Sequence, residues 1–286
     1  MTNTEEIELR LLLDAIFERY QYDFRGYSMR SIGRRLRQAQ QYFQCESLSM
    51  LQHRVLHDPA VLPRLLNYLT IQVSEMFRDP SYFQALRERV IPHLKTYPSL
   101  KVWVAGCADG EELYSLAILF REEGLEDRTL FYATDINPAA LKRAESGIYP
   151  LDRVAKFTEN HRRSGAPCSL SNYYTAAYGA AMFDRSLRGR TVFSEHNLAT
   201  DGVFSEVHLV SCRNVLIYFD RPLQDRALGL FKEALVRGGF LGVGEKETVR
   251  FSSHADAFAD FAREQRIYRR GGAAQNAGRD LGHAAA

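Results

Sequence analysis

Hydrophobic residues in the first part of the chain recur at helical spacing, and no alternating strand pattern interrupts them. Leu62, Leu65, Leu66 and Leu69 form one such stripe. A stripe of this width is what a helix needs to pack against its neighbours. The periodicity therefore predicts a small all-helical domain over residues 1–75.

The pattern changes at residues 100–106, a short β-branched run that ends in glycine. A loop and a helical stripe over residues 113–124 follow, and residues 129–136 form a second buried run. Asn137 occupies the N-cap position of the next helix, because a proline stands directly after it. This alternation predicts consecutive strand–helix units.

Residues 203–212 and 240–244 are predicted strands, and residues 221–239 a predicted amphipathic helix stopped by a glycine pair. Together with the first two strands they predict an α/β fold, with a mostly parallel sheet and helices on both faces. Residues 150–192 lack clear periodicity, but short aromatic runs around Gly179 predict a small antiparallel β insertion.

The composition is that of a folded globular protein, since 45% of the 286 residues are hydrophobic and 25% are charged. The 37 basic residues nearly balance the 35 acidic ones, so the surface as a whole does not favour nucleic acid as a partner. Four scattered cysteines without a CxxC pair argue against a disulfide framework and against a zinc site. We expect reduced thiols and no metal.

The N-terminus lacks the features of a secretory signal, and no apolar run is long enough to cross a membrane. We therefore expect a cytoplasmic protein without membrane insertion, and a monomer by default. The Gly/Ala-rich residues 271–286 are expected to be disordered, because they have no aromatic or β-branched anchors.

Residues 25–37 carry the highest density of one charge in the chain, with five arginines and no acidic residue. The arginines are Arg25, Arg30, Arg34, Arg35 and Arg37. Two interpretations stay open for this run: a solvated helix face, and a surface that binds an acidic partner.

Candidate chemistry begins in the loop after the first strand, where glycines let the backbone approach a ligand closely. Gly106 and Gly110 lack the closely spaced pattern that holds a dinucleotide pyrophosphate. Asp109, Glu111 and Glu112 surround the start of the following helix, where their charge would repel a phosphate. A phosphate-free and preferably cationic ligand fits this loop better.

Asp135 ends the second strand, and a carboxylate at that place can accept hydrogen bonds from both ribose hydroxyls. Adenosine joined to a cation describes S-adenosylmethionine (SAM), which has a sulfonium and an ammonium group but no phosphate. The residues thus favour a SAM-dependent methyltransferase. Two alternatives stay open: Asp135 is only a favourable charge at a helix N-terminus, or the chain is another Rossmann-like enzyme.

Two further segments combine polar and apolar residues beyond what packing requires. Residues 74–83 contain Arg78 at the junction of the two parts, and an acidic ligand group would be a partner for such an arginine. Residues 211–220 place Arg213 and Tyr218 beyond the end of a predicted strand. Structural interpretations also stay open, namely a helix cap formed by Arg78–Asp79 and a core position for Tyr218.

These segments, in this order, resemble the CheR-type chemoreceptor glutamate O-methyltransferases. The resemblance covers residues 5–270 and rests on five collinear motifs: VSEMFRDPSYF, VWVAGCADGEELYSLAI, FYATDINPAALKRAESGIYP, VFSEHNL and SCRNVLIYFD. It implies a Rossmann-like SAM-dependent methyltransferase domain over residues 76–270, preceded by the helical domain. The antiparallel β-subdomain would be inserted at residues 150–192.

The resemblance also implies roles for single residues. Cofactor contacts are implied at Gln72, Ser74, Arg78, Gly106, Glu112, Asp135, Asn197, Leu198, Arg213 and Asn214. Of these, Glu112 would hold the methionine end and Asp135 the ribose. Catalytic roles are implied for Arg78 and Tyr218, which would orient the acceptor carboxylate. Substrate binding is assigned to the arginine run, at Arg30, Arg34 and Arg37.

The implied reaction methylates glutamate side chains in the cytoplasmic helical bundle of a chemoreceptor, or in a related signalling protein, and releases S-adenosyl-L-homocysteine. The chain departs from the family at Gln72, Ser74, Met76 and Asp109. Two alternatives therefore stay open: a cofactor-binding regulatory module without transfer activity, and a methyltransferase for another protein acceptor. A base-flipping nucleic-acid methylase is disfavoured, because residues 211–218 lack an Asn/Asp-Pro-Pro-aromatic clamp.

Overall fold

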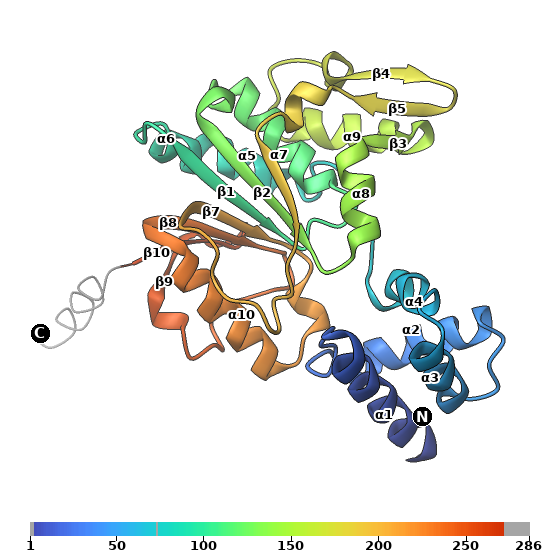
Figure 1. Ribbon diagram of the computed structural model, residues 1–286. Coiled ribbons are helices and arrows are strands. Elements are labelled where there is room, and N and C mark those ends of the chain that lie inside the picture. The colour runs from blue at the N-terminus through green and yellow to red at the C-terminus, as the bar shows by residue number, and fades with distance from the viewer. Residues whose placement is uncertain (1–2, 73, 272–286) are drawn as a thin grey trace, which may run out of the picture.

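Four helices form the N-terminal part of the chain and precede the first strand of the sheet (Figure 1). The structure is a computed structural model that describes residues 3–72 and 74–271. The four helices are α1 (Asn3–Tyr20), α2 (Met29–Tyr42), α3 (Leu48–His57) and α4 (Val61–Leu69). The all-helical character of this part is confirmed, while the domain boundary at residue 75 stays a prediction.

A seven-stranded sheet follows, in the order β6-β2-β1-β7-β8-β10-β9. Its strands are β1 (Leu100–Ala105), β2 (Thr129–Asp135), β6 (Thr191–Glu195), β7 (Val207–Cys212), β8 (Leu235–Val243), β9 (Phe258–Ala262) and β10 (Ile267–Arg270). The first five strands in this order pair in parallel, and β10 and β9 are antiparallel. The mostly parallel sheet is confirmed.

Successive residues of β1 point to opposite faces of the sheet, and each face has its own apolar core. Val104 belongs to the core under α7 (Glu111–Glu122), whereas Trp103 belongs to the core under α10 (Arg221–Ala234). Helices therefore cover both faces, as the alternating pattern predicts. The remaining α-helices of the described chain are α5 (Pro80–Ala85), α6 (Ile91–Leu94), α8 (Pro138–Ser146) and α9 (Leu151–Arg163).

The antiparallel insertion is also confirmed, as a three-stranded sheet in the order β3-β5-β4. Its strands are β3 (Ile148–Pro150), β4 (Tyr174–Ala177) and β5 (Ala180–Phe183). The helix α9 lies between β3 and β4 in the chain, although no helix is predicted there. The sequence of α9 is strongly polar, and only a few side chains such as Val154 and Phe157 are buried.

Two predicted elements have different bounds in the structure. The helix α10 ends at Ala234, and the glycines 238 and 239 lie within β8 instead of stopping the helix. The segment after Ala234 pairs with β7, so sheet pairing overrides its helical spacing. The strand predicted from residue 203 begins only at Val207. The prediction of a disordered tail concerns, apart from Gly271, residues outside the described chain.

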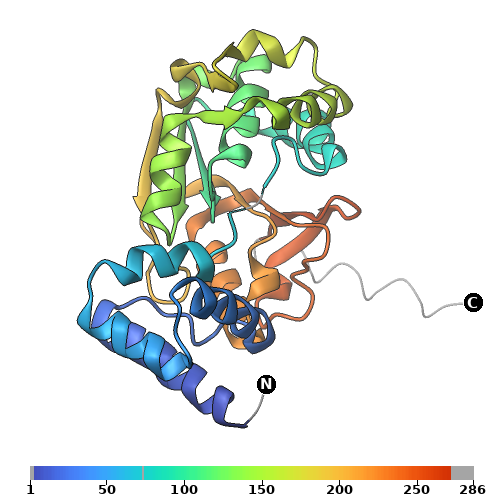
Figure 2. The same cartoon turned by 90° about the vertical axis from the view of Figure 1, so that its right-hand side faces the viewer.

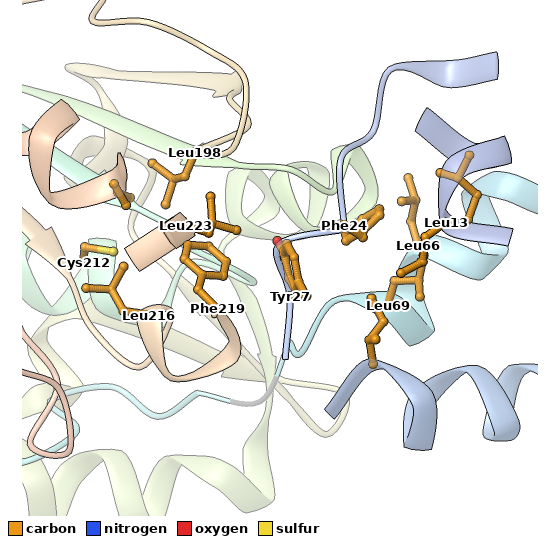
Figure 3. Close-up of a cluster of buried hydrophobic side chains, with 14 of the residues drawn as sticks. Leu13, Phe24, Tyr27, Leu66, Leu69, Leu198, Cys212, Leu216, Phe219 and Leu223 are labelled. Atoms are coloured by element: carbon orange, nitrogen blue, oxygen red, sulfur yellow. The ribbon is translucent and has the colours of Figure 1, made fainter. Parts of the chain in front are cut away.

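A single apolar cluster joins the helical part to the sheet domain. Figure 3 shows Phe24 and Tyr27, which connect α1 to α2, between side chains of both parts. The ring of Tyr27 meets the rings of Phe24 and Phe219 edge to face, with centroids 5.1 and 5.0 Å apart. Figure 2 shows the four helices gathered beyond one end of the large sheet.

Candidate active site

The main cleft lies where the carboxyl ends of β1, β2 and β7 meet the helical part. It holds about 860 Å³ of empty space, part of which is open to solvent. Every residue to which the sequence assigns a cofactor or catalytic role lines this cleft. The structure thus brings those residues together, while their individual roles stay predictions.

Gly106 forms the floor of the cleft directly after β1. Its φ of 71° lies in the left-handed region, which glycine adopts without strain. A Cβ atom here would stand 2.6 Å from Cγ2 of Val215, which belongs to the loop after β7. Glycine at this position therefore allows the loops after β1 and β7 to touch.

The carboxylate of Asp135 is 7% exposed and lies at the end of β2. One oxygen accepts a hydrogen bond from the backbone N–H of Ala108 and the other from that of Asn137, both at 2.9 Å. Burial raises the pKa of Asp135 above its ordinary value. Each oxygen keeps a lone pair for a further donor, so the group is fixed in place and still able to accept ribose hydroxyls.

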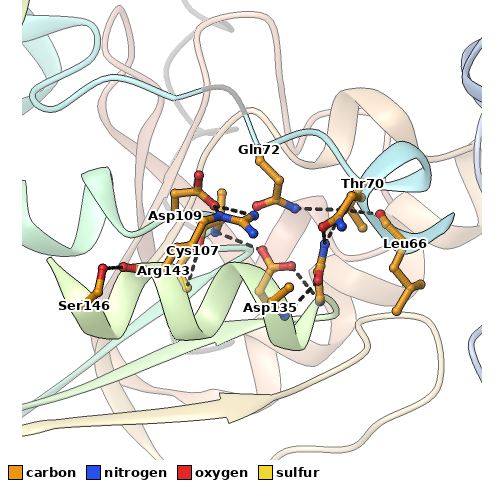
Figure 4. A network of polar contacts seen from close by, with 12 residues as sticks. Leu66, Thr70, Gln72, Cys107, Asp109, Asp135, Arg143 and Ser146 are labelled. Atoms are coloured by element: carbon orange, nitrogen blue, oxygen red, sulfur yellow. Dashed lines mark hydrogen bonds and ion pairs between the residues drawn. The ribbon is translucent and has the colours of Figure 1, made fainter. Parts of the chain in front are cut away.

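A chain of polar contacts connects this carboxylate to the helical part (Figure 4). The Asn137 side chain donates to Thr70 Oγ1 at 3.0 Å, and Gln72 Nε2 donates to the same hydroxyl at 2.8 Å. Thr70 in turn donates to the carbonyl of Leu66 in α4. Thr70 lines the cleft, and nothing in its sequence context singles it out.

Glu112 lies at the inner end of the cleft, in the first turn of α7. Its carboxylate accepts hydrogen bonds from Ser211 Oγ at 2.5 Å and from Arg213 at 3.1 Å. Arg213 also pairs with Asp79 at 2.7 Å, and its side chain is only 1% exposed. A buried guanidinium between two carboxylates orients both of them. The Glu112 side chain lines the cleft, and a carboxylate there suits an ammonium group.

The other acids around the glycine loop are already paired. Asp109 forms an ion pair with Arg143 of α8 at 2.9 Å. Glu111 is fully buried and lies 2.9 Å from Arg153 of α9, and burial raises the pKa of Glu111. Of these three acids, Glu112 is the one that lines the cleft, and it is also the one to which the sequence assigns a cofactor contact.

Arg78 lies between the main cleft and a second, polar cleft formed with α9 and the segment after β8, since it lines both. Its guanidinium makes no hydrogen bond within the described chain. Arg78 is half-buried, so the cation is available to a ligand from either side. The interpretation of Arg78–Asp79 as a helix cap holds only for the position of Asp79, which is the N-cap residue of α5 but makes no side-chain capping hydrogen bond.

Tyr218 reaches the main cleft from a short 3-10 turn after β7 (Leu216–Tyr218). The guanidinium of Arg35 lies 5.4 Å from the centre of the Tyr218 ring. Arg35 itself is 4% exposed and lines the cleft. It is therefore an addition to the site, because the sequence places it only within a run of surface cations.

Arg30, Arg34 and Arg37 do not line the cleft and are exposed on α2. Arg37 approaches Glu5 at 3.5 Å, and with side chains 46% and 41% exposed this pair contributes little to stability. The four arginines of the run that lie on α2 are thus divided between its two sides: Arg35 points inward, whereas Arg30, Arg34 and Arg37 face solvent.

The residues fit SAM at its adenosine end as well. The side-chain Nδ2 of Asn197 and Oε1 of Gln72 are buried and have no partner within the described chain. A donor and an acceptor of this kind match the hydrogen-bonding edge of a purine. Leu198 adds an apolar wall, and the neighbouring His196 also lines the cleft.

Metal binding and a membrane-spanning helix are two further possibilities, and residues 3–72 and 74–271 support neither. No cluster of three or more His, Cys, Asp or Glu side chains in these residues could hold a metal ion. None of the helices in this part of the chain is long and apolar enough to cross a membrane.

Comparison with known proteins agrees with this site. Residues 72–266 match the family described as CheR methyltransferase, SAM binding domain, and residues 7–70 match CheR methyltransferase, all-alpha domain. A protein of Pseudomonas putida that carries the methyltransferase name Cher3 is 57% identical over 265 residues, which are 93% of this chain and 97% of that protein.

Two further relatives are more distant. A chemotaxis protein methyltransferase of Listeria monocytogenes is 34% identical over 194 residues, which are 67% of this chain and 71% of that protein. An uncharacterized 104.1 kDa protein of Rhodobacter capsulatus is 32% identical over 79% of this chain, and the match spans 24% of that longer protein. The chain belongs to the CheR methyltransferase family, and its second domain is a SAM-binding methyltransferase domain.

Proposed function

We propose that the protein transfers the methyl group of SAM to glutamate side chains in the cytoplasmic helical bundle of a chemoreceptor or a related signalling protein. The products are glutamate methyl esters and S-adenosyl-L-homocysteine. One observation supports this most directly: in a protein of this family, the acids suited to SAM and the unpaired cation Arg78 line one cleft. The chemotaxis names of several relatives support the choice of acceptor.

The reaction needs no general base. A glutamate side chain has an ordinary pKa of about 4.3 and is already a carboxylate at neutral pH. Bound SAM supplies a methyl group on a positively charged sulfur, which a carboxylate oxygen attacks in line. The task of the chain is to hold the two reactants in this arrangement, which is worth up to about 7–11 kcal/mol.

Arg78 and Tyr218 are placed to orient the acceptor. Arg78 carries a charge that has no partner among residues 3–72 and 74–271, and the Tyr218 hydroxyl can donate to a second carboxylate oxygen. The cation must not pair too tightly, because a strong ground-state ion pair would make the carboxylate a weaker nucleophile. We therefore expect Arg78 to guide the carboxylate with a long or off-axis contact.

Exclusion of water contributes to the rate. The reaction converts a cation and an anion into two neutral products, and a site that solvates separated charges poorly favours the loss of charge. Tyr27 and Phe219 close the cleft on the side of the helical part. These rings add apolar surface to the lining of the cleft.

The exposed arginines of α2 would bring the acceptor to the cleft. Arg30, Arg34 and Arg37 face solvent on the helix that also carries the inward-facing Arg35. A helical bundle rich in glutamate presents negative charge, which such a surface attracts at a distance. The site of action would then be the cytoplasm.

Methylation is tested directly with the full chain, radiolabelled SAM and purified cytoplasmic fragments of receptors from the same cell. We expect a base-labile label on the fragments, since carboxyl methyl esters hydrolyse in alkali, and mass spectrometry should place it on glutamate. Calorimetric binding of S-adenosyl-L-homocysteine without a labelled acceptor would favour the regulatory module. An alkali-stable label would show that another type of side chain is the acceptor.

A further inference from the structure

Glu247 is a buried carboxylate in the segment after β8, and it lies outside the lining of the main cleft. Its side chain accepts three backbone hydrogen bonds. Oε2 accepts from Asn214 at 2.9 Å and from Gly244 at 2.5 Å, and Oε1 accepts from Ile217 at 3.1 Å. One carboxylate therefore joins the end of β8 to the loop that precedes Tyr218.

The geometry is specific for a carboxylate. All three partners are N–H donors, and an ionised carboxylate is a pure acceptor with two oxygens. A glutamine at position 247 would turn an NH₂ group toward at least one of these donors, and that donor would lose its partner. Glu247 is only 4% exposed, so water does not replace the lost contact easily.

The surrounding backbone is arranged around this carboxylate. Asn214 has a φ of 60°, in the left-handed region, and its N–H points to Glu247. A Cβ atom on Gly244 would stand 2.8 Å from both Asn214 N and Glu247 Oε2. Glycine at 244 thus permits the close approach of the two segments that Glu247 joins.

Glu247 affects the site because the loop that it contacts carries residues of the cleft. Asn214 and Tyr218 both line the cleft, and Ile217 directly precedes Tyr218 in the chain. The bond from Ile217 to Oε1 fixes the peptide between Leu216 and Ile217, one residue before Tyr218. Without this hydrogen bond, the short turn Leu216–Tyr218 would still be paired with the helical part. It would lose its hydrogen bond to the segment after β8.

We propose that Glu247 is a positioning residue that holds the loop from Arg213 to Tyr218 in the conformation required for methyl transfer. This inference rests on the proposed function, in which Tyr218 orients the acceptor. Glu247 acts through the loop and touches neither reactant.

The test compares Glu247→Gln with the matched control Glu233→Gln, which changes an exposed carboxylate on α10. We expect Glu247→Gln to lower kcat at least tenfold and to change the KM for SAM less than threefold. Hydrogen exchange measured by mass spectrometry should show lost protection in peptides that cover residues 213–218, with little change elsewhere. Glu233→Gln should match the unchanged protein in both measurements.

Equal kcat values for Glu247→Gln and the unchanged protein would overturn the positioning role, as would unchanged exchange at residues 213–218. If Glu247→Gln does not fold, Gly244→Ala perturbs the same contact from the other side and should show the same split between kcat and KM. Absence of transfer by the unchanged protein refutes the proposed function itself, so the two failures are distinguishable.

Discussion

The backbone N–H of Ser28 donates a hydrogen bond of 2.8 Å to the carbonyl of Tyr218. The next residue pair along, Tyr27 and Phe219, forms an antiparallel bridge, and Asp220 donates to the carbonyl of Gly26. The start of the arginine-bearing helix α2 is thus paired with the loop of the site. The proposed acceptor binding on α2 and the placement of Tyr218 would therefore depend on the same short contact.

Removal of the Tyr218 hydroxyl tests its role. Tyr218→Phe keeps the ring against Arg35 but deletes the donor that would orient the acceptor carboxylate. We expect kcat to fall roughly 10- to 100-fold, with the affinity for S-adenosyl-L-homocysteine within threefold of the unchanged protein. Tyr178→Phe is the control, because Tyr178 is fully exposed. Equal losses of affinity and kcat would instead place Tyr218 in the cofactor site.

Asp135 is expected to be essential for cofactor binding. Asp135→Ala removes the acceptor for both ribose hydroxyls and should abolish measurable binding of S-adenosyl-L-homocysteine in calorimetry. Asp135→Asn keeps the shape but loses the charge, and a weakening of about 10- to 100-fold follows if a charged hydrogen bond is lost. Asp152→Asn changes an exposed carboxylate and should leave affinity unaltered. Unaltered affinity of Asp135→Ala would disprove the ribose assignment.

Arg153 should stabilise the fold through Glu111. It lies 2.9 Å from this fully buried carboxylate and also donates to the carbonyl of Ser74 in the segment between the two domains. Arg153→Met leaves Glu111 without a cation, and since Arg153 is 32% exposed we expect a loss of about 2 kcal/mol in unfolding free energy.

Chemical denaturation measures this loss, and Arg162→Met is the matched control on the same helix. The side chains of this residue and of its partner Glu159 are 73% and 47% exposed, so the replacement should leave stability almost unchanged. A double variant that also carries Glu111→Gln should recover part of the loss of Arg153→Met. No recovery would mean that the contact with Ser74, and not the charge, is what stabilises.

The exposed arginines of α2 are expected to act through long-range attraction. Replacement of Arg30, Arg34 and Arg37 by glutamate should lower kcat/KM for a receptor fragment at least tenfold at low salt. The difference should shrink as ionic strength rises, because salt screens exposed charges. Methylation rates measured between low and high salt show this dependence, and affinity for S-adenosyl-L-homocysteine should stay constant.

The control for this experiment reverses the same number of charges on other elements. Arg226, Arg237 and Arg263 are exposed on α10, on β8 and after β9. Their replacement by glutamate changes the net charge equally but not the field at α2. An identical loss of kcat/KM in both triple variants would point to net charge alone and would contradict a docking role for α2.

The sequence by itself determined the elements whose signals are local. The run before Gly106, the N-cap at Asn137 and the stripe of α4 each depend on neighbouring residues, so periodicity and capping are sufficient to predict them. The residues assigned to the cofactor by sequence also lie along one cleft, because the ends of parallel strands meet at one edge and the family motifs mark them, whereas Thr70 and Arg35 of the same cleft were not predicted. The bounds of α10 and the helix α9 did not follow, since sheet pairing and insertion contacts act over long distances in the chain.

Tertiary structure alone decided which polar groups are partners. Arg213 meets Asp79 across 134 positions of sequence, and Glu247 reaches Ile217 across 30. The inward turn of Arg35 within a run of surface arginines likewise depends on how α2 packs against the site loop. Such contacts have no periodic or local signature, because they arise only when buried charges and backbone donors from separate segments satisfy one another as the core closes.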